Sequence, residues 1–231
     1  MLSEFFSQLL AEFIGTFLFV LTIPLAPIGV GKLAPLPIGF MLCSMCFTFG
    51  YISGAHFNPA ITFAALINGK FTFQRAFWYI IVQIFGAFCA SLYSMTIVGV
   101  EIGVPSTDMT LGAIWQSVIS ELVYTFALAS VVLHVCFSRQ RSNDFYGFTI
   151  GLTVTCGAFA VGTVSGGAFN PALALGTQLV SCIGGDCKPL LSFWVYWIAP
   201  LLGAFIATII YQILDTHDRG EGKVIVKDAV F

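Results

Sequence analysis

The chain has 231 residues, of which 58% are hydrophobic and 9% charged, and its formal net charge is −2. Soluble domains typically carry about 25% charged residues, so this composition leaves too little polar surface to cover a soluble globule. The small net charge indicates no particular partner, and no nucleic acid is expected.

Six apolar stretches are each long enough to cross the hydrocarbon core of a bilayer, which takes about 20 residues of helix. They are residues 5–25, 33–51, 76–100, 111–137, 145–164 and 189–214. The first and fourth each contain one glutamate, Glu12 and Glu121. The chain begins "MLSEFF" without a basic segment, so we expect the first stretch to be retained rather than cleaved as a signal peptide. The sequence predicts an all-α, multi-pass protein whose surroundings are the lipid bilayer.

The basic residues are distributed unevenly between the two predicted faces. One face holds Lys70, Arg75, Arg139, Arg141, Arg219, Lys223 and Lys227, and the other holds Lys32 and Lys188. Because basic residues concentrate in cytoplasmic loops, this bias predicts that both termini are cytoplasmic. The polar tail, residues 215–231, carries no recognisable address, so a plasma membrane and an intracellular organelle membrane remain alternatives.

The seven cysteines do not suggest a metal or redox centre. Cys43 and Cys46 form a C-x-x-C pair, but they lie in an apolar stretch without a second pair of ligands. Buried cysteines of this kind usually behave as small hydrophobic residues, and we expect neither a metal nor a cofactor. Cys182 and Cys187 fall in a predicted external loop, where a disulfide is possible in an oxidising compartment; the sequence does not decide whether it forms.

An internal repeat organises the chain. Three segments recur in the same order: "AEFIGTF" (11–17) as "SELVYTF" (120–126), "SGAHFNPAITFA" (53–64) as "SGGAFNPALALG" (165–176), and "FGAFCAS" (85–91) as "LGAFIAT" (202–208). Two halves of three spans each, about 5–100 and 111–214, therefore form one domain over residues 1–231. Because each half has an odd number of spans, the second half inserts upside down and produces an inverted repeat.

Each repeated dodecamer contains one N-P-A triplet. The triplets are Asn58, Pro59 and Ala60, and Asn170, Pro171 and Ala172. Asparagine is a favoured helix N-cap, and proline is favoured at the first helical position. About ten apolar residues follow each triplet, too few to span a bilayer. We therefore predict two half-helices that enter from opposite faces and meet at the midplane, preceded by irregular backbone that must line a cavity or be buried in protein.

The paired N-P-A triplets, the duplicated glutamate-bearing spans and the inverted repeat resemble the aquaporins, or major intrinsic proteins. The resemblance covers Glu4 to Leu214. It implies six tilted helices plus two half-helices in an inverted 3+3 repeat, a pore through each subunit, and a homotetramer.

The resemblance also implies roles for individual residues. Asn58 and Asn170 would donate hydrogen bonds to a passing water, and the half-helix dipoles would repel cations. The pore carbonyls would be those of Gly54, Ala55, His56, Gly166, Gly167 and Ala168. Glu12 and Glu121 would hold the two loops, although buried acids can also mark a proton relay or an ion site. His56 would line the inner vestibule, with a role as a pH sensor as the alternative.

The predicted outer constriction departs from the family pattern. Its four positions fall on Ile38, Ala158, Gly167 and Leu173. Water-specific members typically have phenylalanine, histidine, a small residue and arginine at these places. Leu173 supplies neither the charge nor the donors of arginine, so the sequence predicts a wider, apolar and uncharged selectivity filter.

Two further markers favour water. Tyr196-Trp197 is the water-channel pairing, and Ala174 stands where glycerol-conducting relatives usually have aspartate. We expect a passive water channel that excludes protons and ions, with or without leakage of small neutral solutes; the alternative is a channel mainly for glycerol, urea, ammonia or peroxide. A secondary transporter would need an ion-coupling site beyond Glu12 and Glu121. An enzyme would need a clustered nucleophile and base, which the scattered histidines do not provide. A junction protein with a blocked pore is a further alternative.

Overall fold

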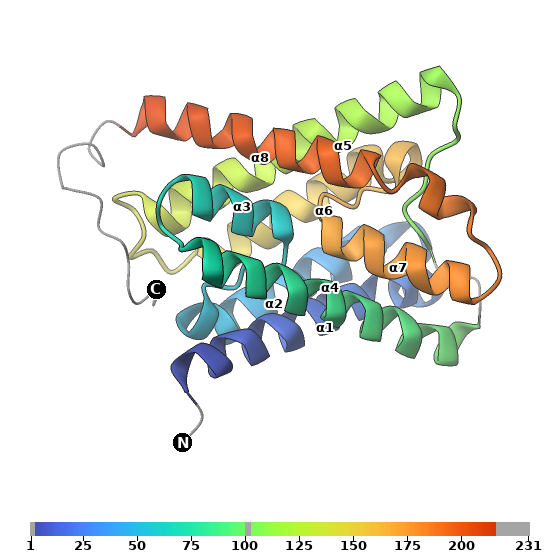
Figure 1. The fold of residues 1–231 in the computed structure, drawn as a ribbon, viewed down its shortest axis with the longest axis horizontal. Helices are drawn as coiled ribbons and strands as arrows, with labels where there is room; N and C mark the ends of the chain where they lie inside the picture. The colour runs from blue at the N-terminus through green and yellow to red at the C-terminus, as the bar shows by residue number, and fades with distance from the viewer. Residues whose placement is uncertain (1–2, 100–102, 216–231) are drawn as a thin grey trace.

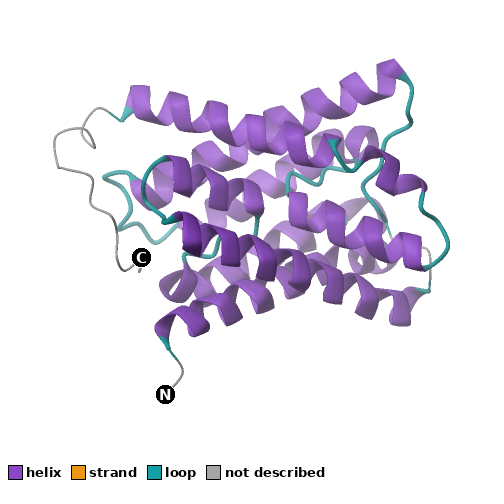
Figure 2. Ribbon diagram, in the orientation of Figure 1, coloured by secondary structure: helices purple, strands orange, loops and turns teal. Residues whose placement is uncertain are grey.

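The computed structural model describes residues 3–99 and 103–215, and within these ranges all regular structure is helical (Figures 1 and 2). The elements in chain order are α1 (Glu4–Val30), the 3-10 turn η1 (Gly31–Leu33), α2 (Pro35–Ser53), α3 (Pro59–Ile67), α4 (Phe73–Val98), α5 (Leu111–Val132), the π-turn η2 (Leu133–Phe137), α6 (Tyr146–Ser165), α7 (Pro171–Ile183), the 3-10 turn η3 (Lys188–Ser192) and α8 (Val195–Leu214).

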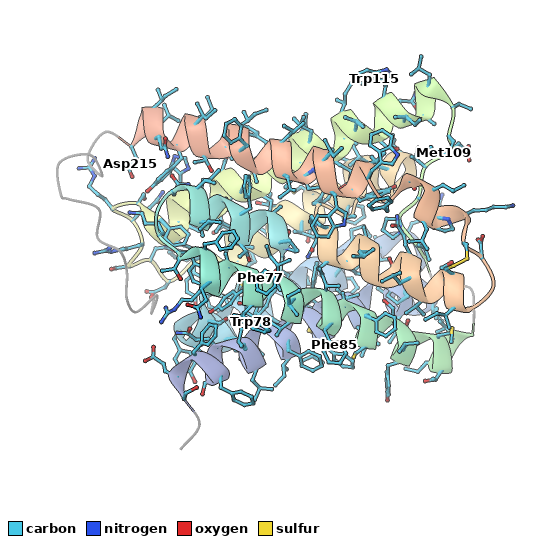
Figure 3. All side chains as sticks on the ribbon, in the orientation of Figure 1. Phe77, Trp78, Phe85, Met109, Trp115 and Asp215 are labelled. Atoms are coloured by element: carbon cyan, nitrogen blue, oxygen red, sulfur yellow. A yellow bond between two sulfur atoms is a disulfide. The ribbon has the colours of Figure 1, made fainter. Side chains whose placement is uncertain are left out.

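Within the described residues, six helical segments are long and apolar enough to cross a membrane, which confirms the predicted number of spans. Their outer surface is apolar as well. Phe77, Trp78 and Phe85 lie on α4 and are 49%, 43% and 56% exposed (Figure 3). Large apolar side chains with this exposure suit contact with lipid rather than with water.

The predicted end of the first span is wrong. Helix α1 continues past residue 25 to Val30, although it contains Pro24 and Pro27. Membrane helices tolerate proline because neighbouring groups satisfy the freed carbonyls. The end of the predicted third span at residue 100 lies outside the described residues, as do three basic residues and a histidine of the tail: Arg219, Lys223, Lys227 and His217.

Equivalent glycines bring helices together in the two halves. A Cβ on Gly86 of α4 would lie 2.8 Å from the Phe13 carbonyl oxygen of α1. A Cβ on Gly203 of α8 would come closer still to the Leu122 carbonyl oxygen of α5. Lipid offers no hydrophobic drive for helix association, so small residues that permit close backbone approach favour packing. The α1–α4 and α5–α8 pairs thus repeat one arrangement.

The half-helices α3 and α7 occupy the middle of the bundle. In Figure 1, α3 lies in the left half and α7 in the right half, with α8 above them and α1 below. The N-cap asparagine of each half-helix donates a hydrogen bond to the residue just before the N-cap of the other, so the two helices start together. From there they run to opposite ends of the bundle (Figure 1). The start of α1 and the end of α8 both lie at the left end of the molecule (Figure 1).

Candidate pore

The two N-P-A triplets start α3 and α7 in the same way. Asn58 is the N-cap of α3, and its Oδ1 accepts from the Ala60 amide at 2.9 Å. Asn170 is the N-cap of α7, and its Oδ1 accepts from the Ala172 amide at 3.0 Å. Each asparagine is followed by a proline that has no amide hydrogen to leave unpaired. The side-chain oxygens therefore cap the helices, and the side-chain Nδ2 atoms are left for other contacts.

Each Nδ2 binds the loop of the opposite half. Asn58 donates to the Phe169 carbonyl at 2.8 Å, and Asn170 donates to the Phe57 carbonyl at 2.8 Å. This reciprocal pair joins the tips of the two half-helices. Because an amide nitrogen carries two hydrogens, one N–H of each asparagine remains beyond this bond.

A cavity of about 20 Å³ lies at the junction, which is room for about one water molecule. Its polar side chains are those of His56, Asn58 and Asn170. Its apolar wall includes Phe19 of α1, Leu42 of α2, Leu128 and Val132 of α5, and Ile150 and Val154 of α6. Both asparagines therefore face a narrow space that is otherwise mostly apolar.

A fully buried glutamate holds the first loop. The Oε1 atom of Glu12 accepts from the Ser53 hydroxyl at 2.6 Å and the His56 amide at 2.9 Å. Its Oε2 atom accepts from the Phe57 amide at 2.7 Å and the Gln83 side chain at 2.8 Å. Backbone N–H groups can only donate, so both oxygens are required as acceptors, which is the bonding pattern of a carboxylate.

Glu121 holds the second loop with equivalent partners. Its Oε1 atom accepts from the Ser165 hydroxyl at 2.8 Å and the Ala168 amide at 2.9 Å. Its Oε2 atom accepts from the Phe169 amide at 2.6 Å. The position equivalent to Gln83 is Pro200, so the second carboxylate has three such bonds where the first has four.

The loops adopt backbone conformations that need this support. Ala55, Phe57 and Phe169 have φ of 46°, 49° and 49°. The left-handed region costs a non-glycine residue about 1–2 kcal/mol. Each phenylalanine is the residue whose amide bonds a glutamate, so the charge-assisted hydrogen bond opposes the strain at the same position.

Two buried tyrosines complete the support, and sequence reasoning missed this role. The Tyr79 hydroxyl donates to the Ser53 carbonyl at 2.9 Å, and the Tyr196 hydroxyl donates to the Ser165 carbonyl at 2.6 Å. In the sequence, Tyr196 stood out only as part of the Tyr196-Trp197 pair. Tyr79 and Tyr196 occupy equivalent positions in the third span of each half, and Ser53 and Ser165 each begin a repeated dodecamer. This equivalence is the sequence signal that could have indicated that the two tyrosines share a role.

His56 belongs to a polar network that exists only in the first half. It is 4% exposed, packs against Phe71 and Tyr79, and its Nδ1 atom lies 3.2 Å from the Thr62 hydroxyl. Thr62 accepts in turn from Gln83 at 3.0 Å. The equivalents of His56, Thr62 and Gln83 in the second half are Ala168, Ala174 and Pro200. The two sides of the central cavity are therefore polar to different degrees.

The four predicted filter residues lie outside the wall of the central cavity. A Cβ on Gly167 would lie 3.5 Å from the Ala158 Cα, so these two positions are in contact. Leu173 is 2% exposed in the first turn of α7, and its amide donates to Asn170 Oδ1 at 3.3 Å. Ile38 lies in the first turn of α2, beside Gly39, which packs against α6. None of the four carries a charge or a side-chain donor.

Cys182 and Cys187 form a disulfide (Figure 3). It closes the turn between α7 and η3 at the right end of the molecule, opposite the start of α1. The other five cysteines are free, and within residues 3–99 and 103–215 no group of three or more histidine, cysteine or acidic side chains could hold a metal ion.

Two half-helices that meet inside a bundle of six spanning helices define a channel-type membrane protein. The model of the major intrinsic protein family matches residues 2–211, and the chain belongs to this family. Family membership confirms the resemblance drawn from the sequence, and the chain is an integral multi-pass membrane protein. The family's members are channels for water or small solutes.

Relatives from distant organisms match nearly the whole chain. The glycerol uptake facilitator protein-like 6 of Lactiplantibacillus plantarum is 34% identical over 218 residues, covering 90% of this chain and 98% of that protein. Aquaporin AqpM of Methanothermobacter marburgensis is 30% identical over 241 residues, covering 90% and 97%. The X-ray structure of the aquaglyceroporin from Plasmodium falciparum superposes with a TM-score of 0.78 at 23% identity, covering 90% and 95%, and shows the shared fold.

Proposed function

We propose that this chain is a passive water channel that excludes protons and ions, with or without leakage of small neutral solutes. The observation that carries the proposal is the pair Asn58 and Asn170, held side by side at a cavity with room for about one water. Each asparagine donates one N–H of its side-chain amide to the loop of the opposite half. The second N–H of the same amide can donate to a passing water.

The arrangement accounts for proton exclusion. A water that accepts from both asparagines has its oxygen lone pairs occupied, so its own hydrogens point away along the pore. The apolar wall, for example Phe19, Leu128 and Val154, offers no replacement donor or acceptor. A hopping proton would need an unbroken donor–acceptor chain, and this water interrupts it. The N-termini of α3 and α7 add positive potential at the same place, which also opposes cations.

Backbone carbonyls would guide water to and from the centre. The candidates are those of Gly54, Ala55 and His56 on one side, and of Gly166, Gly167 and Ala168 on the other. The irregular backbone of both loops leaves these carbonyls outside helical hydrogen bonding, so they are free to accept from water.

A second candidate is a channel mainly for another neutral solute: glycerol, urea, ammonia or peroxide. The proposed outer filter of Ile38, Ala158, Gly167 and Leu173 has no charge and only small or aliphatic side chains, which favours this candidate. The name of the Lactiplantibacillus relative points the same way. Ala174 and the Tyr196-Trp197 pair favour water.

A permeability panel in proteoliposomes separates the two cargoes. Vesicles with the purified protein should shrink faster than empty vesicles in an osmotic step, and uptake of glycerol, urea and ammonia is measured in parallel.

Leu173→Arg should lower the passage of every solute larger than water, because it narrows and charges the filter. Unchanged glycerol and urea flux in this variant would place the filter elsewhere. Water flux equal to that of empty vesicles would refute the water channel.

We also propose that both termini are cytoplasmic and that the chain forms one domain that assembles as a homotetramer. The loops 68–72 and 138–145, with Lys70, Arg139 and Arg141, lie at the same end as the start of α1 (Figure 1). The disulfide lies at the opposite end, and disulfides persist in oxidising compartments. The charge bias and the disulfide therefore support the same orientation.

A further inference from the structure

The side chain of Gln178 on α7 is completely buried and makes one hydrogen bond. Its Nε2 atom donates to the Pro105 carbonyl at 2.9 Å, and its Oε1 atom has no partner among the described residues. The equivalent residue in the first half is Leu66. Burying an amide costs free energy unless it is hydrogen-bonded, so the bond to Pro105 is what compensates a glutamine at this position.

Pro105 belongs to the segment 103–110 between α4 and α5 and is itself buried. It lies directly on Gly166, because a Cβ at Gly166 would come within 2.9 Å of the Pro105 Cα. The same segment is attached a second time, where the Thr107 amide donates to the Ser192 hydroxyl at 3.4 Å. The segment thus crosses from α7 to η3 and covers the loop that precedes the second N-P-A triplet.

Gly166 and Gly167 have φ values of 86° and 61° and no side chains to pack. Their amides donate to the Gly162 carbonyl at 3.1 Å and to the Ser165 hydroxyl at 3.2 Å. Glu121 holds the loop on both sides of the glycine pair, at the Ser165 hydroxyl and at the amides of Ala168 and Phe169. The contact between Pro105 and Gly166 adds a restraint from a different segment of the chain.

We propose that Gln178 is a positioning residue for the outer constriction. Its amide fixes Pro105, Pro105 fixes Gly166, and the position of Gly167 relative to Ala158 sets how wide an opening a solute meets. This inference rests on the proposed function, since it takes Gly167 as part of the filter. Where the filter has no arginine to brace it, the restraint on its backbone determines how well water is separated from larger solutes.

The test compares Gln178→Met and Gln178→Leu with the wild type in lipid nanodiscs and in proteoliposomes. Methionine keeps the approximate volume without the donor, and leucine is the residue at the equivalent position of the first half, Leu66. Gln116→Met, on the exposed side of α5, is the matched control. The first readout is amide hydrogen exchange at residues 166 and 167. The second is the ratio of glycerol to water permeability.

Both Gln178 variants should raise the exchange rate and the permeability ratio about 2- to 10-fold, as expected for the loss of one hydrogen bond, while Gln116→Met changes neither. Unchanged exchange would overturn the restraint by Pro105. Faster exchange with an unchanged ratio would overturn the link to selectivity. A wild type that passes neither water nor glycerol would refute the proposed function, and the selectivity role with it, while the exchange rates still report whether Gln178 restrains the loop.

Discussion

Replacing Glu121 with glutamine perturbs the loop support without changing the size of the side chain. The two carboxylate oxygens accept from two different backbone amides, those of Ala168 and Phe169. A glutamine has one oxygen, so in either orientation its NH₂ group faces one of these N–H donors. A buried N–H without an acceptor costs about 1–3 kcal/mol. We take about 2 kcal/mol, which corresponds to roughly a 30-fold loss in the population of the docked loop relative to undocked states.

The assay is osmotic shrinkage of proteoliposomes at matched protein content, together with unfolding of the same preparations by denaturant. Glu121→Gln should lower both water permeability and the free energy of unfolding. Glu4→Gln is the control, because Glu4 is exposed at the start of α1 and a glutamine oxygen can still accept from Gln8. If Glu121→Gln retained wild-type flux and stability, the view that the carboxylate holds the pore loop would be refuted.

Three further predictions concern packing, access and the disulfide. Gly176→Ala should lower the free energy of unfolding by about 1–3 kcal/mol, because the added carbon would lie 2.7 Å from the Ala87 carbonyl carbon. Denaturant unfolding measures this loss. Gly162→Ala is the control, because there is open space around that position. The wild type should resist mercurial block, and Gly167→Cys should become sensitive in the shrinkage assay; equal sensitivity of both would show that Gly167 is not at the constriction. Cys182→Ser should lower the free energy of unfolding by about 2 kcal/mol, since it opens a short closed loop, with little change in water flux; loss of flux at full stability would contradict that expectation.

Much of the architecture was predictable because the features that specify it are local or periodic. Span length and apolarity indicated the six spanning helices, and Asn58-Pro59 and Asn170-Pro171 indicated where the half-helices begin. The continuation of α1 beyond residue 25 was not predictable. Pro24 and Pro27 suggest a helix end when only the sequence is considered, but whether a proline ends a membrane helix depends on the neighbouring helices.

The sequence singled out candidate site residues, but it did not indicate the contacts between them. The structure brings together the asparagines, the glutamates and the loops that the sequence singled out, whereas the filter role of Leu173 stays a prediction. The bonds from Asn58 to Phe169 and from Gln178 to Pro105 join segments far apart in the chain, and no local pattern encodes such pairs. Gln83, a polar residue inside a predicted span, was one visible signal of a buried hydrogen-bond partner.

The measurement that tests the central claim most directly follows water and protons in the same vesicles. Proteoliposomes containing a pH-sensitive dye are subjected to an osmotic step and, separately, to a pH gradient. The arrangement of Asn58 and Asn170 predicts water permeability well above that of empty vesicles, with a proton leak equal to theirs. Shrinkage no faster than in empty vesicles, or a proton leak that rises with protein content, would contradict the account.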